Sequence, residues 1–218
     1  MIQIQSFPFN DFVENTFVVW DETLNGVIID PGCATQTEQN KLVQFIEKKG
    51  ITVQYLLNTH GHIDHIVGNP FVKKQWNPPF LAHELIVPEI TVAKNYGAMY
   101  GFVIAEDVFP TQFIDAGDTV KFGNTTFSVL YTPGHARSHL SFYEAESKSV
   151  FSGDVLFDSG VGRWDFPGGD FDILMQSIFN ELLTLPEETT VYCGHGNETT
   201  IGREKRLNPY VKSYLKQN

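Results

Sequence analysis

The sequence predicts an α+β protein in which two β-sheets face each other and helices cover their outer sides. Apolar runs of strand length alternate with amphipathic helical segments, and the order strand, helix, strand occurs once in each half of the chain. With 218 residues, 42% of them hydrophobic, the chain is long enough to bury a sizeable core. No repeat of short period and no low-complexity linker divides it, so we expect a single domain over residues 1–218.

The first half begins with strands and continues with a helix. Residues 12–20 and 26–30 predict two strands, and the Asn-Gly dipeptide at 25–26 between them is typical of a hairpin turn. From Thr37 the apolar period becomes that of an amphipathic helix, and Gly50 is a typical stop after the lysines of its last turn. The apolar face of this helix consists of Leu42, Phe45 and Ile46.

The remaining elements continue the alternation of strands and helices. The segment 83–104 looks helical but irregular, because Pro88 and Gly97 interrupt it. A second convincing helix carries apolar residues at a spacing of four. The expected elements are a strand at 51–58, the irregular helix at 83–104, strands within 115–132 and 139–153, the second helix at 170–185, a strand at 189–194 and a terminal helix at 208–217.

Charge and composition restrict the class of partner. The formal net charge of −11 argues against binding to a nucleic-acid backbone, which requires clustered Lys and Arg, so the expected partner is a small molecule. The N-terminal stretch MIQIQSFPFNDF lacks the features of a secretory leader, and no run approaches the roughly 18 apolar residues of a membrane span. We therefore expect a cytoplasmic protein without membrane contact. The oligomeric state stays open.

The stretch THGHIDH, residues 59–65, contains three of the seven histidines of the chain. Residues two apart in an extended loop point the same way, so His60 and His62 are able to reach one metal ion. Asp64 and His65 must point elsewhere, which suggests a second ion nearby. Imidazole nitrogen and carboxylate oxygen are typical ligands of Zn and similar ions, and two-metal sites hold their ions roughly 3.5–4 Å apart. Four ligands do not satisfy two ions, so other segments must contribute.

Three further motifs each follow a predicted strand. TPGH ends with His135, SGD ends with Asp154, and CGHG contains His195. Turn residues accompany each of them, and ligands of layered α/β structures tend to collect beyond the carboxyl ends of strands. The sequence therefore predicts that these three side chains and the histidine cluster converge on one edge of the sheets.

Taken together, the motifs resemble those of the metallo-β-lactamase superfamily. Its pattern THxHxDH, then TPGH, then GD, then GHG occurs here complete and in order, from ENTFVVW and the DPG turn to GHGNETTIGREKRLNP. The resemblance covers nearly the whole chain. It implies the metallo-β-lactamase fold, a four-layer αββα sandwich of two facing mixed β-sheets with helices outside.

The resemblance also implies a set of site residues around two divalent metal ions, with Zn favoured and Fe or Mn as alternatives. It assigns Asp64 a second role, the orientation of a hydroxide between the ions, and it places Asp30 of the DPG turn behind a ligand histidine. For Asp30, turn chemistry alone is the competing interpretation. The implied ligands are His60, His62 and His135 for the first metal, Asp64, His65 and His195 for the second, and Asp154 as the bridge.

Within the superfamily, the sequence is most similar to the short bacterial glyoxalase II-like (hydroxyacylglutathione hydrolase-like) branch, which implies thioester hydrolysis. The bridging residue is an aspartate, whereas the common lactamase branch has a cysteine near that place. Arg163, within GRWDFPGG, resembles a segment near the active site and is a candidate substrate-binding residue; its competing interpretation is an ion pair with Asp165. Only 22 residues follow Gly196, too few for the glutathione-binding helical region of full-length glyoxalase II, so we expect an open pocket.

Three residues outside the ligand set have structural interpretations, and two other functions compete with the dinuclear hydrolase. Cys33 and Cys193 are expected to be small buried apolar residues, and His139 is expected to be structural. A persulfide dioxygenase-like oxidoreductase would use one Fe, held by two histidines and an aspartate. A catalytically silent protein would bind no metal, although nothing in the ligand set is missing. Metal analysis discriminates these alternatives from the dinuclear hydrolase.

Overall fold

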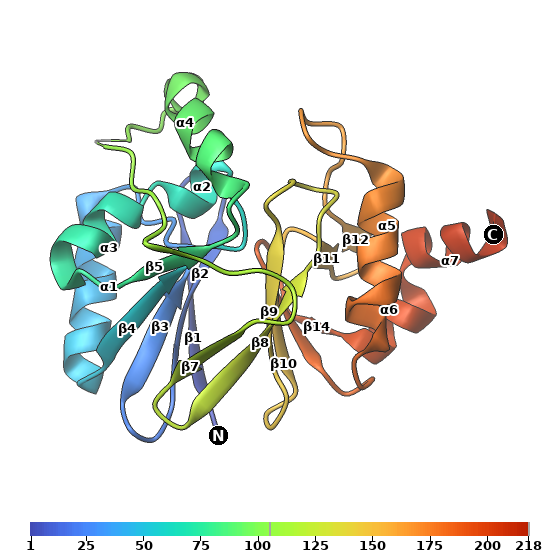
Figure 1. The fold of residues 1–218 in the computed structure, drawn as a ribbon, viewed down its shortest axis with the longest axis horizontal. Helices are drawn as coiled ribbons and strands as arrows, with labels where there is room; N and C mark the ends of the chain where they lie inside the picture. The colour runs from blue at the N-terminus through green and yellow to red at the C-terminus, as the bar shows by residue number, and fades with distance from the viewer. Residues whose placement is uncertain (105, 218) are drawn as a thin grey trace.

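A computed structural model describes residues 1–104 and 106–217 and confirms the predicted α+β architecture. Two six-stranded mixed sheets pack face to face, and helices cover the outer side of each (Figure 1). The first sheet has the order β1 (Gln3–Phe9), β2 (Glu14–Trp20), β3 (Asn25–Ile29), β4 (Thr52–Leu57), β5 (Phe80–Ala82) and β6 (Gln112–Phe113). The second has the order β14 (Thr199–Thr200), β13 (Thr190–Cys193), β10 (Ser149–Gly153), β9 (Leu140–Glu144), β8 (Thr125–Tyr131) and β7 (Thr119–Phe122).

The helices lie in two groups on opposite sides of the sandwich (Figure 1). Those of the first half are α1 (Gln36–Lys49), α2 (Ile63–Ile66), α3 (Asn69–Trp76), α4 (Ile86–Gly97) and the 3₁₀ turn η1 (Ala98–Tyr100). Those of the second half are α5 (Phe171–Asn180), the 3₁₀ turn η2 (Leu182–Thr184), α6 (Ile201–Leu207) and α7 (Pro209–Gln217). A small ribbon of β11 (Leu156–Phe157) and β12 (Gly160–Val161) precedes α5. None of the described helices combines the length and the apolar character needed to cross a membrane.

The layering follows from the side-chain alternation of the strands. In β2, Phe17 and Val19 pack into the core between the two sheets, whereas Val18 and Trp20 pack into the core beneath the helices of the first half. Because successive side chains of a strand point to opposite faces, a central strand with both faces covered becomes apolar at nearly every position. A third core lies between the second sheet and its helices, with Leu174 and Ile178 of α5 in it.

The first predicted helix is confirmed, including its stop signal. Thr35 caps α1 by accepting a hydrogen bond from the Glu38 amide, and the Glu38 carboxylate accepts one in return from the Thr35 amide. At the other end, Gly50 adopts the left-handed conformation with φ of 71°. A side chain would be strained there, which explains the glycine.

The predicted hairpin exists, but its turn was misplaced. β2 and β3 pair antiparallel, with Trp20 opposite Gly26, so the Asn-Gly dipeptide at 25–26 belongs to β3. The turn consists of residues 21–24. The carboxylate of Asp21 accepts a hydrogen bond from the Thr23 amide at 2.9 Å, and Leu24 takes a left-handed φ of 61°. An aspartate turn therefore replaces the Asn-Gly turn that the dipeptide predicts.

Two of the three later predicted helices are shorter than predicted, whereas the terminal helix is found as α7. α4 tolerates Pro88 because the proline lies in its first turn, where amide groups lack helical acceptors, but the helix ends at Gly97. The 3₁₀ turn that follows stops at Gly101, whose φ is 82°. The helix predicted at 170–185 divides into α5 and η2, because Glu181 leaves the helical conformation with φ of −109° and ψ of −64°.

Six strands of the described structure were not predicted: β1, β5, β6, β11, β12 and β14. β1 pairs with β2 along seven residues despite Pro8, which an edge strand tolerates because one side of its backbone needs no partner. β5 and β6 are too short to produce a recognisable alternation. Because β8, β10 and β13 all run in one direction, their carboxyl ends meet at one edge of the second sheet, and the motifs that follow them lie there together.

Candidate metal centre

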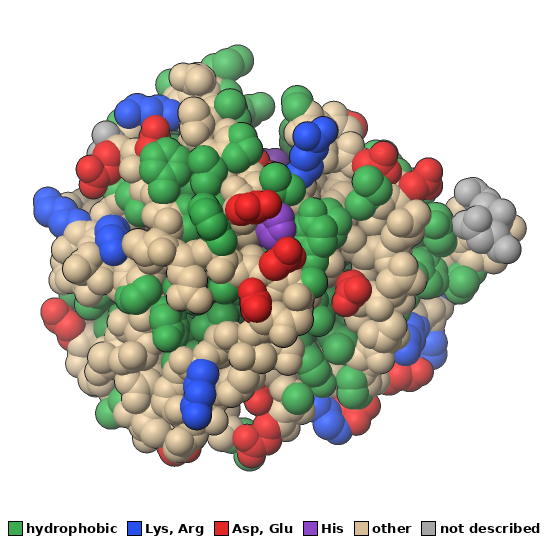
Figure 2. All heavy atoms as spheres, in the orientation of Figure 1, with side chains coloured by type: hydrophobic (Ala, Val, Ile, Leu, Met, Phe, Trp, Pro, Cys, Tyr) green, Lys and Arg blue, Asp and Glu red, His purple; other side chains and the backbone are tan. Residues whose placement is uncertain are grey.

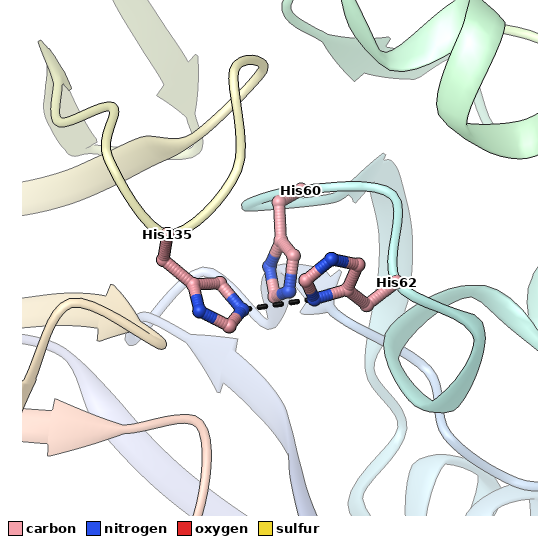
Figure 3. A group of neighbouring side chains, drawn as sticks. All are labelled: His60, His62 and His135. Atoms are coloured by element: carbon pink, nitrogen blue, oxygen red, sulfur yellow. Dashed lines mark hydrogen bonds between the residues drawn. The ribbon is translucent and has the colours of Figure 1, made fainter. Parts of the chain in front are cut away.

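Three histidines point toward one another at the edge where the two sheets meet (Figure 3). His60 and His62 come from the loop after β4, and His135 comes from the loop after β8. Their ligand atoms lie within 4.8 Å of one another, and His62 Nδ1 is 2.8 Å from His135 Nε2. His135 Nδ1 donates to the carbonyl oxygen of Arg163 at 2.7 Å, which leaves Nε2 directed at the other histidines. This group is called the first subsite.

A second group of ligand atoms lies beside the first. Asp64 and His65 belong to α2, and His195 follows β13. The Asp64 Oδ2 atom is 3.1 Å from His195 Nε2 and 3.6 Å from His65 Nε2. His65 Nδ1 donates to Asp30 Oδ2 at 3.1 Å, so its Nε2 faces the group. These three residues form the second subsite.

Asp154 lies between the two subsites. Its Oδ2 atom is 3.5 Å from His135 Nε2 and 3.5 Å from His195 Nε2, and its Oδ1 atom is 3.5 Å from His65 Nε2. The backbone amide of Asp154 donates to His139 Nε2 at 3.1 Å. His139 therefore supports the backbone of Asp154 instead of facing the centre, and a single carboxylate reaches both groups of histidines.

The charges of the centre favour a cation. Burial lowers the pKa of His62 to about 3, with His135 adding to the effect, so this imidazole is neutral at neutral pH. Burial opposes ionisation of Asp154, but His65 and other imidazoles hold the pKa of that carboxyl below its ordinary value. Burial also opposes charge on His65, yet the carboxylates of Asp64 and Asp154 raise its pKa well above the ordinary value. The second subsite thus attracts positive charge.

Divalent metal ions fit these residues. His60 Nε2, His65 Nε2 and Asp154 Oδ1 are buried, and none has a hydrogen-bond partner among the described residues. Buried polar atoms without a partner are costly, so a ligand that satisfies several at once is favoured. The donors are imidazole nitrogens and carboxylate oxygens, which suit Zn, Fe and Mn. Figure 2 shows the surface hollowed between the region of α4 and the loop leading into α5, with a histidine visible in the hollow.

Asp30 supports the centre and does more than form a turn. Its carboxylate accepts hydrogen bonds from the Thr59 amide at 2.7 Å, from Thr59 Oγ1 at 2.6 Å and from Asn58 Nδ2 at 3.1 Å, besides that from His65. Its ligand atoms also lie within 4.8 Å of those of His60 and His65. Because so many donors occupy the carboxylate, we interpret Asp30 as the acceptor that orients His65.

Two buried glutamates near the centre were missed in the sequence. Glu89 of α4 accepts hydrogen bonds from the Gly61 amide at 2.9 Å and from the amide and hydroxyl of Ser138, so it joins the two loops of the first subsite. Glu14 lies 3.9 Å from His65 Nδ1. Burial raises the pKa of both carboxyls. Glu89 lies in none of the motifs named above, and Glu14 begins the stretch ENTFVVW without any sign there of a role beside His65.

The side chain of Arg163 makes the ion pair that was its competing interpretation. Its guanidinium donates to both carboxylate oxygens of Asp165, at 2.9 and 3.0 Å, and lies 4.0 Å from the ring centre of Phe166. The side chain is 64% exposed. It is the backbone carbonyl of Arg163 that contacts the centre, through His135. A substrate that bound this guanidinium would compete with Asp165.

Both cysteines are buried free thiols, as expected. Cys33 packs in the core of the first half and Cys193 in that of the second. Burial raises both pKa values, that of Cys193 to about 12, so neither is a thiolate at neutral pH.

A double variant, Cys33→Ala with Cys193→Ala, is therefore expected to keep its bound metal and its turnover within a few-fold. Metal analysis and steady-state kinetics check this, and circular dichroism reports any loss of stability from the two small cavities. Loss of a metal ion would show that a cysteine ligand was overlooked.

Comparison with known proteins gives consistent results. A family model described as the Metallo-beta-lactamase superfamily matches residues 10–195. Hydroxyacylglutathione hydrolase GloC of Haemophilus influenzae is 36% identical over 222 residues, which cover 97% of this chain and 99% of GloC.

Two solved structures are similar in fold and sequence. BLEG-1, described as a B3 metallo-beta-lactamase, has a TM-score of 0.85 and 31% identity over 96% of this chain and 99% of its own. TTHA1623 in a di-iron-bound form has a TM-score of 0.84 and 35% identity over 94% of this chain and 99% of its own.

Proposed function

Because the chain belongs to the metallo-beta-lactamase superfamily, we propose that it is a dinuclear metal hydrolase that cleaves small-molecule thioesters. The name of GloC supports a hydrolase. One observation carries the dinuclear part of the proposal: the Asp154 Oδ2 atom lies equally far, at 3.5 Å, from a nitrogen of each subsite. A carboxylate placed in this way is suited to bridge two cations.

In this proposal, seven side chains hold two divalent ions, either Zn or Fe, the metal in the similar TTHA1623 structure. When bound, such ions lower the pKa of a coordinated water to near neutral, which supplies a hydroxide nucleophile, and they polarise a substrate carbonyl. The first subsite contributes three neutral imidazoles. The second contributes two imidazoles and a carboxylate. The positive charge of an ion bound there would therefore be neutralised to a greater extent than in the first subsite. The ligands are those of the first subsite (His60, His62, His135), those of the second (Asp64, His65, His195) and the bridging Asp154.

The side chains of this site would have distinct tasks. Asp64 would accept a hydrogen bond from the attacking hydroxide and thereby orient its lone pair toward the carbonyl carbon. Asp30 would keep the Nδ1 proton on His65, so that Nε2 stays available. The leaving thiolate would need little assistance from an acid, because a thiol has a pKa of about 8.5.

Metal analysis together with a thioester assay tests the proposal. Two ions per chain and hydrolysis of S-lactoylglutathione would support it. One Fe per chain with thiol-dependent oxygen uptake would instead support the persulfide dioxygenase-like alternative, and a protein without metal would support a silent role. A chromogenic β-lactam belongs in the same assay, because BLEG-1 is described as a lactamase. Faster cleavage of that compound than of any thioester would overturn the proposed substrate class.

The pairing of basic side chains predicts weak selectivity for the thiol part of the substrate. Arg163 is held by Asp165 and Arg203 by Asp158, and both pairs are exposed, so they would discriminate only weakly between substrates. We expect S-lactoylglutathione and a pantetheine thioester to have kcat/KM values within about a hundredfold, or about 2.7 kcal/mol. Steady-state kinetics on both esters decides this. A much larger preference for the glutathione ester would reveal a clamp for its carboxylates.

A further inference from the structure

The turn between β1 and β2, with its flanks, contacts every residue of the second subsite. This segment, residues 10–15, is called the entry turn. Asn10 Nδ2 donates to the backbone carbonyl of Asp64 at 3.0 Å, and Glu14 Oε1 lies 3.9 Å from His65 Nδ1. Glu14 is completely buried and accepts a hydrogen bond from Thr16 Oγ1 at 2.9 Å. Two ligands of the second subsite thus have a neighbour in the entry turn.

The third ligand of the second subsite, His195, and the loop that carries it have more hydrogen bonds to the entry turn than Asp64 and His65 have. His195 Nδ1 donates to the carbonyl oxygen of Phe12 at 3.0 Å, which fixes the tautomer and directs Nε2 at the centre. Asn15 Nδ2 donates to the carbonyl oxygens of Cys193 and Gly196, at 3.0 and 2.9 Å. The Asn15 amide donates to Gly194 at 2.7 Å. The loop that carries His195 is therefore fastened on both sides of the histidine.

The first subsite takes its support from other segments. His60 Nδ1 contacts Thr59 Oγ1 at 3.0 Å, and His135 Nδ1 donates to Arg163 at 2.7 Å. Glu89 of α4 joins the two loops that carry this subsite. Asp30 is a support that the two subsites share, because it accepts from His65 and from Thr59, which contacts His60. Among the described residues, no hydrogen bond or ion pair of the entry turn reaches a ligand of the first subsite, so a change in the entry turn would act first on the second subsite.

The backbone of the entry turn is strained. Asn10 has φ of 51° and Val13 has φ of 56°. A positive φ is unusual for a β-branched residue because its side chain crowds the backbone. The Val13 side chain does not offset this strain by burial, since the residue is 57% exposed. Strain of this kind persists where surrounding contacts determine the conformation, and the contacts here lead to the second subsite.

We propose that the entry turn orders the second subsite and sets its affinity for a divalent cation separately from that of the first subsite. The inference rests on the proposed function in one respect, the presence of two metal subsites. Asn10, Phe12, Glu14 and Asn15 are positioning residues, because they act through the ligands they hold. By fixing the ligands before the cation arrives, they reduce the ordering cost of binding.

Val13→Pro is the test, because proline fixes φ near −65° and removes the amide that donates to Asn10 at 3.2 Å. The matched control is Leu24→Pro in the turn between β2 and β3. Leu24 is also an exposed apolar residue with a positive φ, 61°, and its amide also donates within its turn, to Asp21 at 3.0 Å. Val13→Gly is a second control, because glycine adopts the native positive φ without strain.

Each variant is titrated with Zn²⁺ against a competing chelator, and imidazole ¹⁵N shifts identify the histidines that bind. Val13→Pro is expected to weaken Zn²⁺ binding at the second subsite at least tenfold, with altered shifts at His65 and His195 only. Leu24→Pro and Val13→Gly are expected to keep both affinities within threefold. Unchanged affinities in Val13→Pro, or equal losses at both subsites in a folded protein, would overturn the proposal.

A second variant keeps the proposal falsifiable if Val13→Pro does not fold. Glu14→Gln preserves the size of the side chain and the oxygen that accepts from Thr16, but it replaces the carboxylate beside His65. It is expected to weaken Zn²⁺ binding at the second subsite about tenfold. An unchanged affinity there would count against the proposed role of the entry turn. A wild-type protein that binds fewer than two Zn²⁺ would instead refute the proposed function itself.

Discussion

Replacing Asp154 with alanine is expected to lower thioester hydrolysis by at least about 1000-fold, which corresponds to roughly 4 kcal/mol of transition-state stabilisation. The carboxylate lies 3.5 Å from nitrogens of both subsites, so its loss removes the bridge between them. The variant should retain at most one metal ion per chain. Its fold should persist, because the backbone amide of residue 154 still donates to His139.

Three measurements check this expectation. Steady-state kinetics gives the loss of activity, metal analysis gives the stoichiometry, and circular dichroism confirms the fold. Asp158→Ala is the control, because Asp158 lies four residues further along and its carboxylate pairs with Arg203 at the surface. The control should keep its activity within a few-fold. Full activity of Asp154→Ala with two metals retained would refute the bridging assignment.

Gly194→Ala is expected to cost at least about a hundredfold in activity, although it adds a single methyl group. A Cβ atom at this position would lie 2.2 Å from Asp154 Oδ1 and 2.9 Å from His65 Cε1, so it would displace two proposed ligands. The backbone has little room to yield, because the Gly194 amide donates to Gly153 at 2.8 Å. Displacement of a reacting group by about 1 Å is sufficient for a loss of this size.

The control for this variant is Gly160→Ala in β12. There the nearest heavy atom to an added Cβ is Phe157 Cβ at 3.7 Å, an ordinary van der Waals contact. Kinetics and metal analysis of the two variants should therefore differ, with the control close to the wild type. Wild-type turnover in Gly194→Ala would mean that Asp154 and His65 do not need their present positions.

The sequence predicted that the residues of the centre lie together, because strands that run in the same direction end at the same edge of a sheet. His135, Asp154 and His195 are far apart in the chain, yet each follows a strand, and three strands of one sheet run in the same direction. The spacing within THGHIDH likewise separated His60 from Asp64, and the structure places them in different groups. Local periodicity and strand direction are therefore enough to bring such residues together.

The supports of the centre were not predictable in the same way. Glu14 contacts His65 across 50 intervening positions, and nothing near Glu14 in the chain indicates this contact. Val13 takes a left-handed conformation that a β-branched residue avoids, so local preference predicted continued strand from residue 12. In both cases tertiary contacts override local tendencies. The side chain of Arg163 shows the converse, since its nearest acidic neighbour in the chain, Asp165, is its partner.

The proposed ligands come from both halves of the sandwich, with four from the segment that follows β4 and three from the loops of the second sheet. A bound ion is therefore also a crosslink between the two sheets. By thermodynamic linkage, a ligand present at a thousand times its dissociation constant stabilises the folded chain by about 4 kcal/mol. Metal supply would then govern the lifetime of the protein as well as its activity. The metal-free chain should therefore unfold, and be cleaved by a protease, more readily than the metal-loaded chain.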